Sequence, residues 1–176
     1  MTLWVFGYGS LLWHAGFEVA RAEPATLHGY HRSFCMTSVH YRGTEDAPGL
    51  VLALDAQPGA VCRGMALSAM DGQEEATLAY LRERELISYA YVEHNVELGL
   101  DSGETVTAVA YVIDRNHAQY AGDLGREEQA RIIATAQGNN GPNADYLTNT
   151  TERLHALGLS DPDLDWLAAR VRAIRG

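Results

Sequence analysis

The chain opens with Leu3-Trp4-Val5-Phe6-Gly7-Tyr8-Gly9-Ser10-Leu11-Leu12-Trp13, an apolar run interrupted by two glycines. Its first half favours an extended, half-buried backbone, which predicts a strand that ends at Gly7. Gly7 and Gly9 then permit turn angles that side chains resist. In such a turn several backbone N–H groups, together with the Ser10 hydroxyl, can converge on an anion or a carbonyl oxygen. The stretch therefore predicts a strand followed by a candidate oxyanion-binding turn, with a simple tight turn as the alternative.

The same glycines do not fit three other glycine-containing motifs. A phosphate-binding P-loop needs a lysine after its glycines, and all 13 basic residues of this chain are arginines. A dinucleotide-binding fingerprint needs a third glycine three residues after the second, where Leu12 stands. A nucleophile elbow needs a glycine two residues after its serine, and Leu12 again occupies that position. Ser10 is therefore expected to be a hydrogen-bond donor rather than a nucleophile.

Length and charge limit the classes of protein and partner. With 176 residues, the chain is expected to form a single domain over residues 1–176 that buries a sizeable core. The formal net charge of −10 argues against nucleic acid and anionic membrane surfaces, whose phosphates would repel it. Met1 is followed directly by the first strand, without a signal-peptide pattern, and no apolar run approaches the roughly 20 residues of a bilayer span. These features, which leave small substrates open, lead us to expect a cytoplasmic protein.

Cysteines and histidines give no metal-binding pattern. Cys35 and Cys62 lack C-x-x-C spacing and lie in strand-like runs, which indicates buried thiols rather than a disulfide scaffold. His28 and His31 are three residues apart, so they would face opposite sides of a strand. We therefore expect no metal site.

The remaining pattern predicts strands followed by helices. The segment 14–24 is expected to be a loop, and Gly29 marks a bulge or bend in the strand that follows it. Strands are expected at 25–39, 50–54, 61–67, 89–98 and 105–113, in addition to the first. Helices are expected at 71–87, 126–137, 143–157 and from 161 onwards, where Asp161-Pro162 provides a cap and a first-turn proline. Because the order lacks βαβ repeats, the prediction is an α+β fold: a small mixed or antiparallel β-barrel of about six strands with flanking helices.

The first of these helices carries a glutamate on its apolar face. At about 100° per residue, Leu78, Leu81 and Glu85 fall within roughly 60° of one another, whereas Glu83 points away from them. Glu85 also lies near the helix C-terminus, where the dipole disfavours negative charge. Burial and the dipole would both raise its pKa towards the range useful for a general base or acid.

A structural ion pair is the alternative interpretation of Glu85. Two arginines, Arg82 and Arg84, are close in sequence. Three more could approach from elsewhere in the fold: Arg42, Arg63 and Arg115. The position of Glu85 on the helix leaves the catalytic and the structural interpretation open.

Several motifs in order resemble one family. The run 5–11 followed by Trp13 resembles the opening signature of the ChaC-type γ-glutamylcyclotransferases. The resemblance extends over nearly the whole chain through Arg32 and Phe34, Arg42-Gly43, Pro48-Gly49, Cys62-Arg63-Gly64, Tyr80-Leu81-Arg82-Glu83-Arg84-Glu85, Gln119-Tyr120-Ala121-Gly122 and Asn143-Ala144-Asp145-Tyr146-Leu147.

This resemblance implies a small β-barrel with flanking helices that cleaves glutathione, a small molecule, to 5-oxoproline and Cys-Gly. Because the attacking amine in that reaction belongs to the substrate, the resemblance also implies that no cofactor is needed. Glu85 matches the catalytic glutamate of the family, and Tyr146 matches a tyrosine near the pocket. The loop that binds the γ-glutamyl group corresponds to Val5, Phe6, Gly7, Tyr8, Gly9, Ser10 and Leu11. After the glutamate the chain has Leu86-Ile87-Ser88 before Tyr89, where many members have Gly-Gly-Tyr or Gly-Tyr. Other γ-glutamyl amino acids or γ-glutamyl amines therefore stay open as substrates, as does a non-catalytic binding or regulatory role linked to cation transport.

Overall fold

The computed structural model describes residues 1–86, 89–122, 124–159 and 161–176, and contacts within the chain divide it into two compact units. The first unit consists of residues 1–32 and 54–117, and the second of residues 33–53 and 118–176. Two long strands, β2 (Val19–Ser38) and β3 (Gly49–Ala69), contribute residues to both units.

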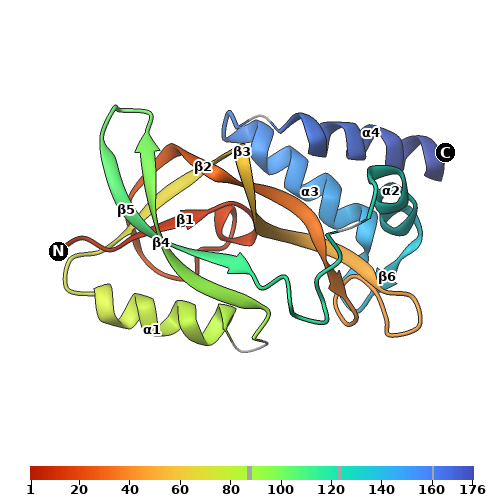
Figure 1. Cartoon of the computed structure of the whole chain (residues 1–176), viewed down its shortest axis with the longest axis horizontal. Helices are drawn as coiled ribbons and strands as arrows, with labels where there is room; N and C mark the ends of the chain where they lie inside the picture. Colours follow the sequence, from red (N-terminus) through yellow and green to blue (C-terminus); the bar gives the residue numbers. More distant parts are fainter. Residues whose placement is uncertain (87–88, 123, 160) are drawn as a thin grey trace. The chain divides into compact units, whose positions relative to one another are not determined.

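The first unit contains a closed barrel with strand order β1-β3-β2-β4-β5 (Figure 1). The short strand β1 (Trp4–Gly7) pairs antiparallel with β3 and parallel with β5 (Thr105–Ile113), so the barrel is mixed. Antiparallel pairing joins β4 (Tyr91–Leu100) to β5 through a tight turn in which the Gly103 N–H donates to the Leu100 carbonyl at 2.9 Å. The predicted α+β barrel is confirmed, with five strands in the barrel instead of about six.

Apolar side chains from all five strands fill the barrel. Trp4, Phe6, Leu54, Leu98 and Ala110 are buried in one continuous cluster. Phe6 is completely buried in this core, and its strand β1 pairs with β3 on one side and β5 on the other. The strand that leads into the Gly-x-Gly turn is therefore held firmly in place.

Two predictions about strand limits were wrong. Segments 50–54 and 61–67, which the sequence predicted as separate strands, belong to the single strand β3. Pro58-Gly59 does not divide the segment into two strands. Gly59 adopts a φ of 81°, which only glycine takes readily, and β3 continues on both sides of it. Likewise β2 begins at Val19 rather than after residue 24, and Gly29 takes a φ of 87° inside it, as a bulge or bend requires.

The helix of the first unit is α1 (Glu74–Glu85), shorter than the predicted 71–87. It starts later because residues 70–73 form a turn in which the Gln73 N–H donates to the Met70 carbonyl at 2.9 Å. Gln73 occupies the N-cap position without a side-chain cap. Ile87, the predicted last residue of this helix, lies outside the described residues.

The second unit is mainly helical. It contains α2 (Arg126–Thr135), α3 (Asn143–Ala156) and α4 (Pro162–Arg175), with α4 packed against the other two (Figure 1). Asp161 caps α4 by accepting a hydrogen bond from the Leu164 N–H at 3.2 Å, as the sequence predicted. The helix predicted for 126–137 ends at Thr135, because Gln137–Gly138 pair with Gly141–Pro142 as the small strands β6 and β7.

Asn143 does not cap α3 with its side chain, because that side chain binds the backbone of β3 instead. It is completely buried, and its amide accepts from the Leu50 N–H and donates to the Leu50 carbonyl, both at 2.8 Å. We expect Asn143→Ala to lower the free energy of unfolding by about 3 kcal/mol, because two buried backbone groups lose their partner. Denaturant unfolding measures this loss. Asn149→Ala, at an exposed position of the same helix, is the matched control, and equal stabilities for the two variants would contradict the prediction.

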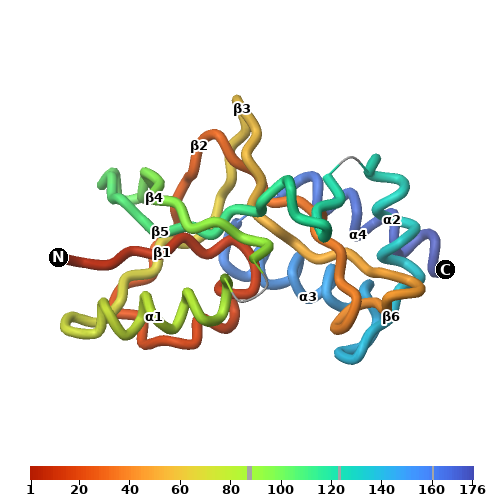
Figure 2. Tube along the Cα trace, turned by 60° about the horizontal axis from the view of Figure 1, so that its bottom comes forward, coloured from red at the N-terminus to blue at the C-terminus, as the bar shows by residue number. Residues whose placement is uncertain are grey.

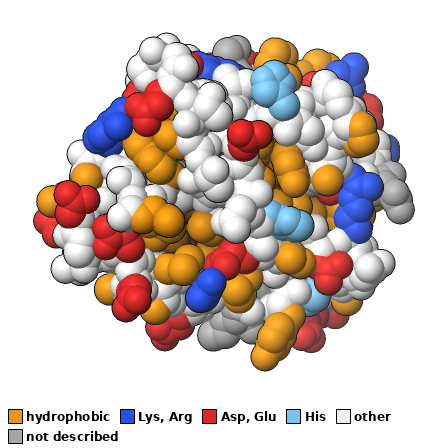
Figure 3. Space-filling view, turned by 60° about the vertical axis from the view of Figure 1, so that its left-hand side comes forward, with side chains coloured by type: hydrophobic (Ala, Val, Ile, Leu, Met, Phe, Trp, Pro, Cys, Tyr) orange, Lys and Arg blue, Asp and Glu red, His pale blue; other side chains and the backbone are white. Residues whose placement is uncertain are grey.

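Acidic side chains are more widespread than basic ones on the face shown in Figure 3, in line with the net charge of −10. Within the described ranges, no helix is long and apolar enough to cross a membrane.

Candidate functional site

The loop predicted to bind the γ-glutamyl group exposes little of its side chains. Val5 and Phe6 are completely buried, and Tyr8 lies in the barrel core with its hydroxyl donating to the Tyr111 carbonyl at 3.4 Å. After Gly9 the chain forms the 3₁₀ helix η1 (Ser10–Leu12), in which the Leu12 N–H donates to the Gly9 carbonyl at 2.9 Å. Of residues 5–11, Ser10 is the exposed one. This loop can therefore offer a ligand its backbone and one hydroxyl.

The first N–H groups of any such helix have no partner within the helix. In η1 these belong to Ser10 and Leu11, directly after the two glycines. The strand and the turn after it are thus formed as the sequence predicted, and the binding of an oxyanion by these N–H groups stays a prediction.

Glu85 is the last residue of α1 and is largely buried, with its side chain 15% exposed. Its helix presents the fully buried Leu81 on the same face, whereas Glu83 is exposed. Burial raises the pKa of the Glu85 carboxyl above the usual 4.5, and the positive charge of Arg84 partly offsets this rise. The predicted orientation and the predicted direction of the pKa shift are confirmed.

The structure also identifies the ion-pair partner of Glu85. Arg84 Nε lies 3.5 Å from Oε1 of Glu85. The other four candidate arginines contact other groups: Arg82 binds Glu93, Arg63 binds Asp101, Arg115 binds Asp55, and Arg42 binds the Asn140 and Pro142 carbonyls. The net pKa shift remains upward, so the pair does not neutralise the effect of burial.

Three side chains, one each from α1, β4 and β5, form a set of hydrogen bonds. Arg82 donates to both carboxylate oxygens of Glu93, at 3.0 and 2.9 Å, and the Tyr111 hydroxyl donates to Glu93 at 2.9 Å. Burial and the bond to Glu93 raise the pKa of Tyr111, and the charge of Glu85 adds to that rise. Tyr111 is therefore a neutral donor held close enough to Glu85 to interact with it electrostatically. No sequence pattern indicated this set of hydrogen bonds, because Arg82, Glu93 and Tyr111 are 11 to 29 positions apart on three elements.

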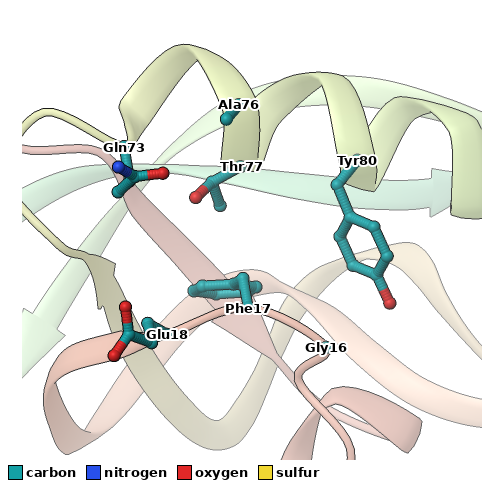
Figure 4. Close-up of a pocket in the computed structure, with 7 residues that line it drawn as sticks. All are labelled: Gly16, Phe17, Glu18, Gln73, Ala76, Thr77 and Tyr80. Carbon is teal, nitrogen blue, oxygen red and sulfur yellow. The ribbon is translucent and has the colours of Figure 1, made fainter.

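A groove of about 230 Å³ lies along the N-terminal part of α1, whereas Glu85 is the last residue of the helix (Figure 4). Gly16, Phe17 and Glu18 form one wall, and α1 forms the other with Gln73, Ala76, Thr77 and Tyr80. Figure 4 shows Tyr80 pointing from the helix towards the backbone at Gly16. A Cβ atom at Gly16 would lie 1.9 Å from the Tyr80 hydroxyl, and Gly16 has a φ of 79°, so glycine is required for this close approach.

Tyr146, the remaining predicted site residue, belongs to the second unit. Its hydroxyl accepts a hydrogen bond from the Leu52 N–H at 3.2 Å, and Phe34 packs edge-on against its ring. The guanidinium of Arg42 lies 5.7 Å from the centre of the same ring. These contacts tie α3 to β2 and β3, and a substrate-binding role for Tyr146 stays a prediction.

Cys35 and Cys62 are buried thiols, as predicted. In the part of the chain that the structure describes, no cluster of three or more His, Cys, Asp or Glu side chains could hold a metal ion. Beyond Glu85 lies Tyr89, which has a φ of 59°, a conformation that favours glycine. Ile87 and Ser88, where the chain departs from the family pattern, lie outside the described residues.

The raised pKa of Glu85 predicts how its replacement changes stability with pH. Because the folded protein binds this proton more tightly than the unfolded chain, the stability that the group contributes is fully present below about pH 4.5. That stability is lost as the pH rises through the folded pKa, when a buried carboxyl must ionise. We therefore expect Glu85→Gln to gain stability relative to the wild type as the pH rises from 4 to 8. Thermal unfolding of both proteins across this range measures the difference, and a difference that is constant or falls with pH would contradict the prediction.

Comparison with known proteins agrees with this architecture. A family model described as ChaC-like protein matches residues 3–174. The glutathione-specific γ-glutamylcyclotransferase of Escherichia coli (strain K12) is 36% identical over 172 residues, which cover 98% of this chain and 74% of the bacterial protein. The γ-glutamylcyclotransferase 2-3 of Arabidopsis thaliana is 33% identical over 180 residues, covering 99% and 90% of the two chains. A crystal structure of a γ-glutamyl cyclotransferase specific to glutathione from yeast covers 100% of both chains with a TM-score of 0.85 at 23% identity, which shows a shared fold. Since the family model covers almost every residue, this chain belongs to the ChaC-like family.

Proposed function

We propose that this chain is a glutathione-specific γ-glutamylcyclotransferase, acting as one domain over residues 1–176 in the cytoplasm. Relatives that carry this activity in their names match 98% of the chain in Escherichia coli and 93% in Danio rerio. The reaction releases 5-oxoproline and Cys-Gly, so the protein serves glutathione catabolism.

The reaction is a cyclisation in which the substrate supplies its own nucleophile. The α-amino nitrogen of the γ-glutamyl group attacks its own γ-carbonyl carbon, forming the C–N bond of 5-oxoproline. The amide bond to the cysteinyl nitrogen breaks, and one proton moves from the attacking amine to the leaving amine. No water, electron or further reactant enters, and holding the γ-glutamyl chain curled supplies the proximity that such a step needs.

The observation that carries this proposal is Glu85, a largely buried carboxyl with a raised pKa next to Arg84, which in turn contacts Ser10 of the loop. A carboxylate in this setting can take the proton from the α-amine and deliver it to the leaving nitrogen. Burial makes it a stronger base than a solvated glutamate, because its ionised form is less stable.

The loop supports the second half of the mechanism. Backbone N–H groups around Gly9, Ser10 and Leu11 would stabilise the oxyanion that develops on the γ-carbonyl oxygen, a contribution of roughly 3–4 kcal/mol for each donor in measured cases. Residues 5–8 hold the turn in place through the barrel core. Tyr146 would contact the substrate near the pocket, as the family resemblance implies.

Release of 5-oxoproline from glutathione tests the proposal. We expect release by the wild-type protein, at the same rate with and without EDTA, and weaker release from γ-Glu-Ala. Equal or greater turnover of γ-Glu-Ala or a γ-glutamyl amine would assign a different leaving group. No release from any γ-glutamyl substrate would contradict the proposal and favour a non-catalytic binding role.

A further inference from the structure

The side chain of Arg84 joins α1 to the chain around η1. One terminal nitrogen donates to the His14 carbonyl at 2.7 Å and to the Ala15 carbonyl at 3.1 Å. The other terminal nitrogen donates to the Ser10 hydroxyl at 3.1 Å. Figure 2 shows the segment after η1 running back along α1, which is the arrangement that these bonds hold. A single guanidinium thus fixes the start of η1 and the segment just after it to the helix.

The same guanidinium contacts two side chains of its own helix. Nη1 donates to the Tyr80 hydroxyl at 3.4 Å, one turn earlier, and Nε lies 3.5 Å from the Glu85 carboxylate. Arg84 is 20% exposed, so solvent screens these contacts only in part. The planar fork of arginine can reach the Ser10 hydroxyl, the carbonyls and the carboxylate at once, whereas the compact ammonium group of a lysine cannot.

We propose that Arg84 is a positioning residue that sets the place of the Ser10 turn relative to the Glu85 carboxylate. This inference rests on the proposed function, because it concerns how the acid–base group and the oxyanion-binding turn of that reaction are held together. A displacement of about 1 Å between such groups is enough to cost roughly a hundredfold in rate. Arg84 therefore acts through Ser10 and Glu85 and need not touch the substrate.

Arg84 also acts on Glu85 through its charge, which lowers the pKa that burial raises. Among the described residues, Tyr111 of β5 also interacts electrostatically with Glu85, and its hydroxyl donates to Glu93 of β4, which Arg82 also binds. His14, whose carbonyl binds Arg84, is exposed. Removing the positive charge of Arg84 would raise the pKa of Glu85 further, so the ionised base would form only at higher pH.

The test measures kcat, KM and the pH dependence of kcat/KM for glutathione in Arg84→Met and Arg84→Lys. We expect kcat to fall roughly 10- to 100-fold in both variants, because both lose the shared contacts to Ser10 and the carbonyls. The acid limb of the profile should move to higher pH in Arg84→Met and less so in Arg84→Lys, which keeps the charge. His14→Gln keeps its backbone carbonyl, so an unchanged limb in that variant excludes the His14 side chain as the group that sets the limb.

Arg131→Met is the matched control, because Arg131 is an exposed residue of α2 paired with Glu128. We expect wild-type kinetics from it. Wild-type kcat and an unmoved acid limb in Arg84→Met would overturn the inference, as would a loss of rate that matches the loss of folded protein without any shift of the limb. If Arg84→Met does not fold, the kcat of Arg84→Lys decides. Failure of the proposed function is a separate result, since the wild-type protein would then release no 5-oxoproline.

Discussion

Replacement of Glu85 by Gln is expected to remove 5-oxoproline release, with a fall in kcat of at least about a hundredfold. The amide keeps the size and the burial of the side chain but cannot accept the proton of the α-amine. Because Gln also fills the site without an ionised group, the fold and the binding of glutathione should persist. Single-turnover release of 5-oxoproline and glutathione binding by calorimetry measure the two effects separately.

Glu83→Gln provides the matched control for this variant. It makes the same chemical change two residues away on α1, at an exposed position. We expect it to retain wild-type turnover. If Glu85→Gln kept full activity, Glu85 would have no role in proton transfer, and if both variants lost activity equally, the cause would lie in the helix rather than in the carboxylate.

The sequence allowed the barrel class and the face of Glu85 to be predicted because both depend on local patterns. Hydrophobic period identifies strands and the buried side of α1, and that period places Leu81 and Glu85 together. The prediction of two separate strands failed at Pro58-Gly59. Such a dipeptide usually marks a chain reversal, but here it lies within β3. Whether such a dipeptide reverses the chain depends on the pairing available on both sides, which is a tertiary property.

The contacts around Glu85 could not be predicted in the same way. Two arginines precede it in sequence at positions 82 and 84, and helix geometry does not tell which one reaches the carboxylate. Which arginine pairs with Glu85 depends on distant elements. Ser10 of η1 accepts a hydrogen bond from Arg84, and Glu93 of β4 accepts one from Arg82. Asn143 illustrates the same limit, since its type predicts a cap while a distant backbone segment binds its side chain.

Gly64→Ala is expected to reduce both stability and activity, because β1 and β3 approach each other closely at this residue. A Cβ atom at Gly64 would lie 2.4 Å from the Gly7 carbonyl oxygen and 2.7 Å from the ring of Phe6. Phe6 is completely buried and Gly7 pairs with Met65, so neither can yield without shifting β1. Overpacking of this kind costs about 2–3 kcal/mol, which corresponds to a fall in Tm of roughly 5–10 °C for a protein of this size.

The displaced residue Gly7 begins the turn that carries Ser10, so the loss of activity should exceed the loss of folded protein. We expect kcat/KM per folded molecule to fall at least about tenfold, since small displacements of positioned groups are costly in rate. Gly99→Ala on β4 is the matched control, because a Cβ atom there meets nothing within 4 Å. That variant should keep its activity and its Tm. Equal behaviour of the two alanine variants would mean that β1 can move away from β3 without disturbing the turn, and the turn would then owe its geometry to η1 and Arg84 alone.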